Sequence, residues 1–204
     1  MSGDRDLRDA WERLYSGQSR PWRGSADLSW VEFPPGSRVL DAGCGNGKCT
    51  ETLLDTGAVV TGVDFSPSAV ESCRSRFGSK AVFEVADLRD LPFEDGSFDV
   101  VLAQHSLEHI SSESEHLALS EFRRVLKPGG LLYLQVFAEG DFRSGGEAES
   151  VRNGILYRYH SEDSLRASLT GWDVTSLCTE EERTRFGEIR RRIRVIARPD
   201  AHFN

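Results

Sequence analysis

The sequence predicts an α/β fold built on a mainly parallel sheet of seven strands with helices on both faces. Short apolar runs alternate with helical segments along the 204 residues. The runs are apolar enough for strands that are buried on both faces of a sheet. The first run leads into an acidic residue and three alternating glycines, and acidic side chains also follow the next two runs. This order is typical of parallel strands that are joined by helices.

Seven strands and four helices are predicted after residue 36. We expect strands at residues 37–42, 58–63, 81–85, 98–103, 131–137, 173–178 and 189–198. Helices are expected at residues 48–56, 68–77 and 113–126, and a further helix is capped by Ser161 and runs through Leu169. Ser112 and Glu115 form a capping box for the third helix, which ends before Pro128. Residues 139–153 are predicted to form a polar loop.

Length and charge favour one enzyme-sized domain that does not grip nucleic acid by itself. The 204 residues suffice for one core without a metal or disulfide, and the four cysteines form no CxxC pair. The net charge of −8 argues against DNA as a partner, because phosphate binding usually needs a basic surface. The start of the chain is charged and no apolar run approaches membrane-spanning length, so we expect a cytoplasmic protein without a membrane span.

The glycine turn after the first strand indicates a nucleoside ligand without a bound phosphate. Asp41 ends the strand, and Gly43, Gly45 and Gly47 follow it. A dinucleotide turn would need glycine at position 48, where the chain has lysine, and a phosphate-binding loop would need glycine at position 42, where it has alanine. Asp64 lies about 20 residues further on, the spacing at which a carboxylate meets ribose hydroxyls.

The DxGxGxG pattern resembles motif I of the class I S-adenosylmethionine-dependent methyltransferases, and the resemblance covers residues 37–137. It implies a Rossmann-like sheet whose last strand is antiparallel, and S-adenosyl-L-methionine as cofactor. In such a sheet ligands bind at the carboxyl ends of the strands, where Asp41, Asp64, Asp87 and Gln104 would converge. The expected cofactor-binding residues are Arg20, Asp41, Gly43, Cys44, Gly45, Gly47, Asp64, Phe65, Ser66, Asp87, Leu88 and Gln104.

The resemblance also implies roles for these residues. Asp41 would orient the amino group of the cofactor, Asp64 would accept from the ribose hydroxyls, and Asp87 and the Leu88 amide would meet the adenine. Gln104 and His105 would flank the methionine part and the acceptor entrance. Residues 1–36 would be a helical arm that caps the site, with Arg20 pairing with the cofactor carboxylate, and residues 37–204 would be the methyltransferase domain.

His105, Glu108 and His109 spell HxxEH, a zinc-peptidase pattern. A zinc site on this pattern needs both histidines on one face of a helix, whereas here the string follows a buried strand, so we expect no metal. His105 is instead the candidate general base, with His160 and Tyr159 as further candidates. Six arginines between residues 183 and 194 are interpreted as the outward side chains of a strand, opposite inward Ile193 and Val195, with a patch that binds a substrate phosphate as the alternative.

The predicted activity is transfer of a methyl group from S-adenosyl-L-methionine to an unidentified acceptor, which could be a small molecule, RNA or protein. A small molecule is favoured. The residues at 20–22, 45–48 and 157–160 also resemble wobble-uridine tRNA methyltransferases that work with a small zinc-ribbon activator subunit, so an RNA or translation-related substrate is the alternative. A non-catalytic sensor of S-adenosylmethionine or S-adenosylhomocysteine is the alternative of another class.

Overall fold

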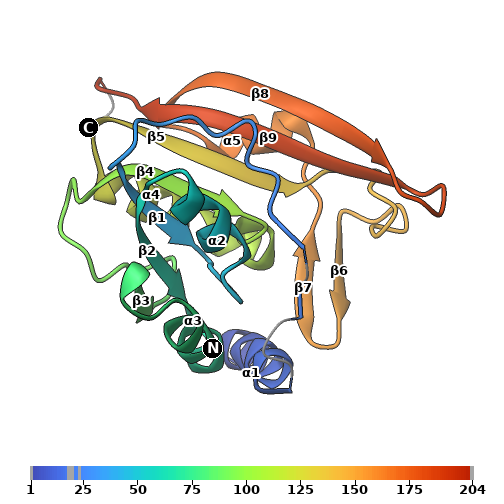
Figure 1. Ribbon diagram of the computed structural model, residues 1–204. Coiled ribbons are helices and arrows are strands. Elements are labelled where there is room, and N and C mark those ends of the chain that lie inside the picture. The colour runs from blue at the N-terminus through green and yellow to red at the C-terminus, as the bar shows by residue number, and fades with distance from the viewer. Residues whose placement is uncertain (1, 18–20, 23, 203–204) are drawn as a thin grey trace.

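The computed structural model describes residues 2–17, 21–22 and 24–202, with side chains described from residue 7 onward. Seven strands form one sheet in the order β3-β2-β1-β4-β5-β9-β8 (Figure 1). The bounds are β1 Arg38–Ala42, β2 Val59–Asp64, β3 Val82–Val85, β4 Phe98–Gln104, β5 Leu126–Phe137, β8 Trp172–Arg183 and β9 Ile189–Pro199. β9 runs antiparallel to both of its neighbours, and the pairs among β1 to β5 are parallel. The predicted fold class is confirmed, including the antiparallel last strand.

Helices cover both faces of the sheet because alternate strand residues are apolar on both sides. The helices are α1 Ser2–Gly17, α2 Lys48–Asp55, α3 Pro67–Phe77, α4 Ser112–Val125 and α5 Glu162–Ser168. Leu40 faces α4 and α5, where Phe122 and Leu165 are fully buried, whereas Val39 packs on the other side with Leu53 of α2. The helix α1 lies beside α3 and closes over the strand ends (Figure 1). Burial of both sheet faces supplies the main stabilisation.

Two predicted details of the helical and loop regions are wrong. The helix α4 has Ser111 as its N-cap without a side-chain cap bond, because Glu115 turns inward to bond His160 and Arg158 instead of closing a capping box. The predicted loop at 139–153 contains a strand, since β6 Glu149–Arg152 pairs with β7 Ile155–Arg158 in a separate hairpin. A capping box does form at α5, between Ser161 and Ser164.

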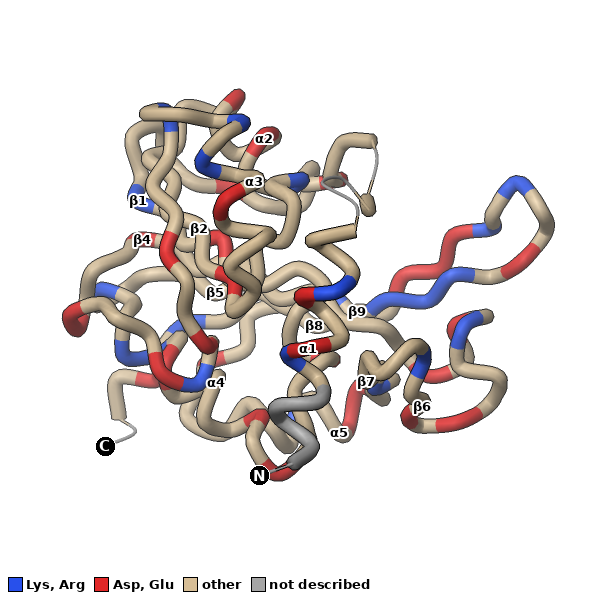
Figure 2. Tube along the Cα trace, turned by 90° about the horizontal axis from the view of Figure 1, so that it is seen from below, with Lys and Arg blue, Asp and Glu red and all other residues tan. Residues whose placement is uncertain are grey.

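The arginine-rich strand β9 lies opposite a glutamate-rich stretch of β8, and the two charge rows run along the hairpin that extends from the sheet (Figure 2). Arg192 pairs with Glu182 and Arg191 pairs with Glu181 at 2.7 Å. Ile193 and Val195 are buried as predicted, but Arg194 is only 7% exposed and not outward in solvent. It is covered by the segment after α1, where it lies over the Trp30 ring. The hairpin arginines are therefore largely neutralised within the chain.

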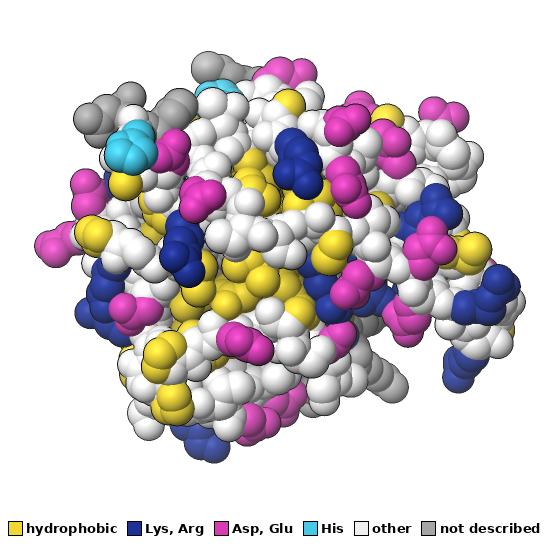
Figure 3. All heavy atoms as spheres, turned by 90° about the horizontal axis from the view of Figure 1, so that it is seen from above, with side chains coloured by type: hydrophobic (Ala, Val, Ile, Leu, Met, Phe, Trp, Pro, Cys, Tyr) yellow, Lys and Arg dark blue, Asp and Glu magenta, His cyan; other side chains and the backbone are white. Residues whose placement is uncertain are grey.

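The surface carries charges of both signs. On the face shown in Figure 3, Lys and Arg side chains are interspersed with Asp and Glu around a central apolar area. Within the described residues, no helix is both long and apolar enough to cross a membrane. The mixed charge agrees with the modest net charge of −8 for 204 residues.

Candidate functional site

One pocket lies at the carboxyl ends of β1 to β4, where the strand order reverses between β1 and β4. It holds about 720 Å³ of empty space, including its open mouth. Each of the four strand ends contributes to the lining, and the helix α1 covers it from outside. The lining residues are Leu7, Arg8, Trp11, Tyr15, Gly43, Asp64, Phe65, Asp87, Leu88, Arg89, His105, Ser106, His109, Ile110 and Ser111. A crevice at this place is where ligands bind in open α/β sheets.

The glycine turn has no room for side chains. A Cβ atom on Gly43 would lie 2.5 Å from the Cβ of Ser106, and one on Gly45 would lie 2.5 Å from the Tyr15 hydroxyl. Gly47 has φ 76° and serves as N-cap of α2. A Cβ atom added to Gly47 would lie 2.4 Å from the Phe77 ring. The turn therefore needs glycine both for its left-handed backbone and for the close approach of neighbouring groups.

Two buried carboxyl groups hold this turn. Asp41 accepts a hydrogen bond from the Thr50 hydroxyl at 2.6 Å, and Asp64 accepts from the Gly45 and Ser66 amides at 2.9 and 3.0 Å. Burial raises the pKa of both carboxyl groups to about 6, against the lowering effect of these hydrogen bonds. Asp64 lines the pocket, whereas Asp41 lies behind the glycine turn.

Asp87 is held by two arginines at the end of β3. Arg89 donates to both carboxylate oxygens at 2.9 and 2.8 Å, and Arg8 of α1 donates to Oδ2 at 2.5 Å. Burial alone would raise the pKa of Asp87, but the arginine bonds and charges keep it below its ordinary value. Asp87 is thus an ionised acceptor at the pocket wall, next to Leu88.

His105 follows β4 with a left-handed backbone, φ 57°, which is rare for a residue with a side chain. Its Nδ1 lies 2.7 Å from Oε1 of the fully buried Glu108, and its Nε2 lies 2.9 Å from Nε2 of Gln135. The ring stacks on Phe137 with centroids 4.4 Å apart. Burial would raise the pKa of Glu108, but the neighbouring His105 keeps it below its ordinary value, so the pair joins an imidazole to a carboxylate.

The structure brings together most, but not all, of the residues predicted for the site. Gly43, Asp64, Phe65, Asp87, Leu88 and His105 line the pocket. Cys44, Gly45, Gly47 and Ser66 support the turn and the start of α3, and Gln104 lies outside the lining, where it accepts from Cys49 at 3.3 Å. Arg20 lies outside the described residues.

The HxxEH string forms a short 3₁₀ turn, Leu107–His109, and not an α-helix with both histidines on one face. His109 donates from Nδ1 to the Leu156 carbonyl at 2.6 Å, and burial lowers its pKa, so it is neutral. Among the described residues, no group of three or more His, Cys, Asp or Glu is arranged to hold a metal ion.

Sequence reasoning missed the residues that fasten α1 over the pocket and the partner of His105. Glu12 accepts from the Ser66 and Ser68 side chains at the start of α3, and Arg8 pairs with Asp87. The spacing of Arg8, Glu12 and Tyr15 on one helical face was an available signal. Gln135 was visible as the one polar residue inside the apolar run 131–137, and a buried amide needs partners.

Comparisons with known proteins agree with this geometry. Residues 40–134 match the model of the family described as Methyltransferase domain. The match spans the glycine turn and the ends of all four strands that line the pocket. Residues 40–134 are therefore similar to a methyltransferase domain. The cofactor of this family is S-adenosyl-L-methionine.

Curated relatives and solved structures of methyltransferases are also similar to this chain. A 27-O-demethylrifamycin SV methyltransferase from Amycolatopsis mediterranei (strain S699) is 38% identical over 123 residues, which are 57% of this chain and 44% of the relative. A solved S-adenosylmethionine-dependent methyltransferase from Methanosarcina mazei is 25% identical, with a TM-score of 0.74 over 87% of this chain and 99% of that one. The chain spans about half or less of the length of the curated relatives it matches.

A methyltransferase solved in complex with the Haloferax volcanii Trm112 methyltransferase activator has a similar fold. It is 24% identical, with a TM-score of 0.73 over 98% of this chain and 99% of that one. At this identity the likeness concerns the fold.

The side chains and main chain that line the pocket fit the cofactor of this family. Gly43 lines the pocket with main chain alone, and Asp64 and Asp87 offer acceptor oxygens at the wall. Within the described residues, the Ser106 hydroxyl is buried at the pocket without a hydrogen-bond partner. These groups suit a ligand with a ribose diol and an exocyclic amine and without a phosphate, because the glycines of the turn at 43–48 do not have the spacing of a phosphate-binding loop.

Proposed function

We propose that the protein transfers a methyl group from S-adenosyl-L-methionine to a small acceptor. The observation that carries this proposal is the convergence of Gly43, Asp64 and Asp87 from three separate strands on one pocket. The cofactor supplies an activated methyl group on its sulfonium. The protein needs mainly to align the acceptor behind that methyl and to exclude water.

Each acidic residue has a proposed task in holding the cofactor. Asp64 accepts from the ribose hydroxyls with lone pairs that the Gly45 and Ser66 amides leave free, and Asp87 accepts from the adenine amine. Asp41 stiffens the turn through Thr50 and orients the amino end. Arg20 remains the proposed partner of the cofactor carboxylate.

Two side chains of α1 have to move before the cofactor can enter the pocket. Arg8 occupies Oδ2 of Asp87, and Tyr15 lies against Gly45, so both side chains stand where the adenosyl group would lie. Arg8 is half exposed, and such a pair contributes at most about 1 kcal/mol, which cofactor contacts can replace. We therefore propose that residues 1–36 act as a cap that shifts when the cofactor binds and then encloses it.

Aromatic side chains that line the pocket, or pack against its lining histidines, favour a small, flat or apolar acceptor. Trp11 and Tyr157 both meet the His109 ring edge to face at 4.9 Å, and His105 stacks on Phe137. The two arginines in the lining, Arg8 and Arg89, are engaged with Asp87 and so offer no free phosphate contact. The net charge of −8 also favours a small acceptor over RNA.

His105 is the proposed general base, with Glu108 supporting the imidazolium that forms. Replacing His105 with Gln is expected to lower turnover by about 100-fold or more while leaving cofactor affinity unchanged, since general bases typically contribute factors of 10² to 10⁴. Single-turnover kinetics and calorimetric titration with S-adenosylhomocysteine measure the two effects separately. A fully active His105→Gln variant removes His105 from the mechanism.

Cofactor affinity is expected to fall in acid because Asp64 has to be ionised to accept from the ribose. With a pKa of about 6 in the free protein, Asp64 is ionised above pH 6 and takes up a proton below it. Binding holds the charged form, so Kd should be flat from pH 7 to 8 and rise by up to about tenfold per pH unit below about 6. Asp41, also near 6, can steepen the fall. Calorimetry between pH 5 and 8 checks this, and a flat profile contradicts the assignment.

Two alternatives are separated by one set of experiments. A translation-related acceptor with a small zinc-ribbon activator is supported by the fold likeness to the activator-bound Haloferax methyltransferase. Tritiated-methyl transfer to fractionated cell extract, with and without nuclease, distinguishes small-molecule, RNA and protein acceptors. A sensor would retain the cofactor tightly and label nothing, whereas failure to bind either sulfur nucleoside at millimolar concentration would overturn the proposal as a whole.

A further inference from the structure

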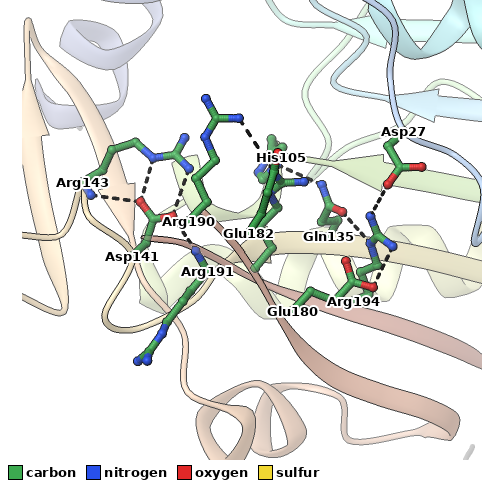
Figure 4. Close-up of polar contacts among 11 residues, drawn as sticks. Asp27, His105, Gln135, Asp141, Arg143, Glu180, Glu182, Arg190, Arg191 and Arg194 are labelled. Carbon is green, nitrogen blue, oxygen red and sulfur yellow. Dashed lines mark hydrogen bonds and ion pairs between the residues drawn. The ribbon is translucent and has the colours of Figure 1, made fainter. Parts of the chain in front are cut away.

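A chain of side chains leads from the pocket to the outer strands of the sheet (Figure 4). His105 contacts Gln135 of β5, and Arg194 of β9 donates from Nε to Oε1 of Gln135 at 2.9 Å. Arg194 also pairs with Asp27 at 2.7 Å and Glu180 at 2.8 Å. Gln135 is fully buried and Arg194 is nearly so. These contacts link residues separated by up to 167 positions in sequence.

Arg194 determines which way the Gln135 amide faces. A guanidinium has only donors, so the group of Gln135 that meets it has to be the carbonyl oxygen. The amide NH₂ is then forced toward His105, where it donates to Nε2 at 2.9 Å. The opposite orientation would place two donors against each other beside Arg194 in a buried site, which is costly.

The hydrogen bonds of the two ring nitrogens determine which nitrogen of His105 carries the proton. Nε2 receives a hydrogen bond, so it carries a lone pair, and Nδ1 carries the proton and donates to Glu108. The Gln135 carbonyl oxygen of the main chain also accepts from the His105 amide at 2.9 Å, which holds the left-handed backbone in place. The charged and titratable groups around the ring are Glu108, His109 and, through Gln135, Arg194.

We propose that Arg194 and Gln135 are positioning residues that keep Nε2 of His105 free of a proton, so that it can accept one from the methyl acceptor. In the proposed reaction the O–H or N–H of the acceptor would replace the Gln135 N–H at Nε2, and its proton would pass to Nε2. The electron pair left on the acceptor would form the new bond to the methyl carbon while the carbon–sulfur bond of the methyl donor breaks, and the pair of that bond would stay on the sulfur of the S-adenosylhomocysteine product. The catalytic meaning of this arrangement rests on the proposed function, but the proton position does not.

Nitrogen-15 NMR of the imidazole rings tests the proton position without any assay of activity. At neutral pH the wild-type protein should show His105 with an unprotonated Nε2, the signal being assigned by its loss in His105→Gln. In Arg194→Met the Gln135 amide is free to turn, and a fraction of Nε2 should gain a proton. In Gln135→Glu the new carboxylate is always an acceptor, so Nε2 should be protonated in most molecules even if the first variant folds poorly.

Arg192→Met is the matched control, because Arg192 lies on the same strand in an ion pair with Glu182, outside the chain of contacts to His105. It should leave the His105 signals and turnover unchanged. Gln135→Glu should lower turnover by about 100-fold, the size expected when a base is lost, with the Kd for S-adenosylhomocysteine within about twofold of wild type.

The outcomes separate this inference from the proposed function. A wild-type Nε2 that already carries a proton, or no change in Gln135→Glu, overturns the positioning role of Arg194 and Gln135. A shifted proton with unchanged turnover leaves the positioning of the proton in place and overturns the role of His105 as base.

Discussion

Replacing Asp64 with Asn is expected to weaken binding of S-adenosylhomocysteine by about 100-fold or more. The carboxylate accepts from two backbone amides and, in the proposed complex, from the ribose hydroxyls. An asparagine keeps one acceptor oxygen and turns an NH₂ group toward one of these donors. Charge-assisted hydrogen bonds contribute about 1.5–3 kcal/mol each, and the variant loses at least one of them together with the negative charge. Calorimetric titration at neutral pH measures the loss.

The same substitution should change the free energy of unfolding far less than it changes binding. Burial raises the pKa of Asp64 above its unfolded value, so the ionised carboxylate opposes folding at neutral pH, by about 3 kcal/mol for a rise to about 6. Asparagine removes that cost but leaves one buried amide without its acceptor, and the two effects largely cancel. Asp173→Asn, on the exposed surface of β8, is the matched control for loss of one charge. Equal binding by Asp64→Asn and the control would contradict the assignment.

Replacing Gly43 with Ala is expected to abolish cofactor binding and to lower the free energy of unfolding by about 3 kcal/mol. The backbone at Gly43 has φ 81°, which costs a residue with a Cβ about 1–2 kcal/mol. The new Cβ would also lie 2.5 Å from the Cβ of Ser106, an atom fixed to the main chain that cannot move aside by rotation. Forcing it away costs a further 1–3 kcal/mol, roughly, and shifts the pocket wall. Denaturant unfolding and calorimetry measure the two effects.

Two further variants separate the causes. Gly36→Ala has the same left-handed backbone, φ 82°, with nothing within 4 Å of the added Cβ, so it should cost only about 1 kcal/mol and leave binding intact. Adding Ser106→Gly to Gly43→Ala removes the atom that is struck and should restore part of the lost stability. A Gly43→Ala protein as stable as Gly36→Ala would show that the close approach is absent in solution.

The order of the strands and helices could be predicted because it depends on local patterns. For six of the seven sheet strands, the start predicted from the apolar runs lies within about two residues of the start in the structure. The glycine turn and Asp64 belong to one strand-helix-strand unit, and their spacing along the chain placed them correctly. The hairpin of β6 and β7 was missed because its residues are mostly exposed or half-buried and lack an apolar alternation. The cap of α4 was misplaced because Glu115 finds stronger partners, Arg158 and His160, more than 40 residues away.

Residue types and their spacing determined the fold class and the cofactor family, since backbone turns and strand ends are local properties of the chain. The tertiary structure alone decided which side chains fasten α1 over the pocket, namely Arg8 and Glu12, and that Arg194 is buried among Asp27, Glu180 and Gln135. Strand alternation says which side of the sheet a residue faces, but not whether another segment covers that side. Contacts between distant segments arise only when the layers pack, and they fix the amide of Gln135 and the proton on His105.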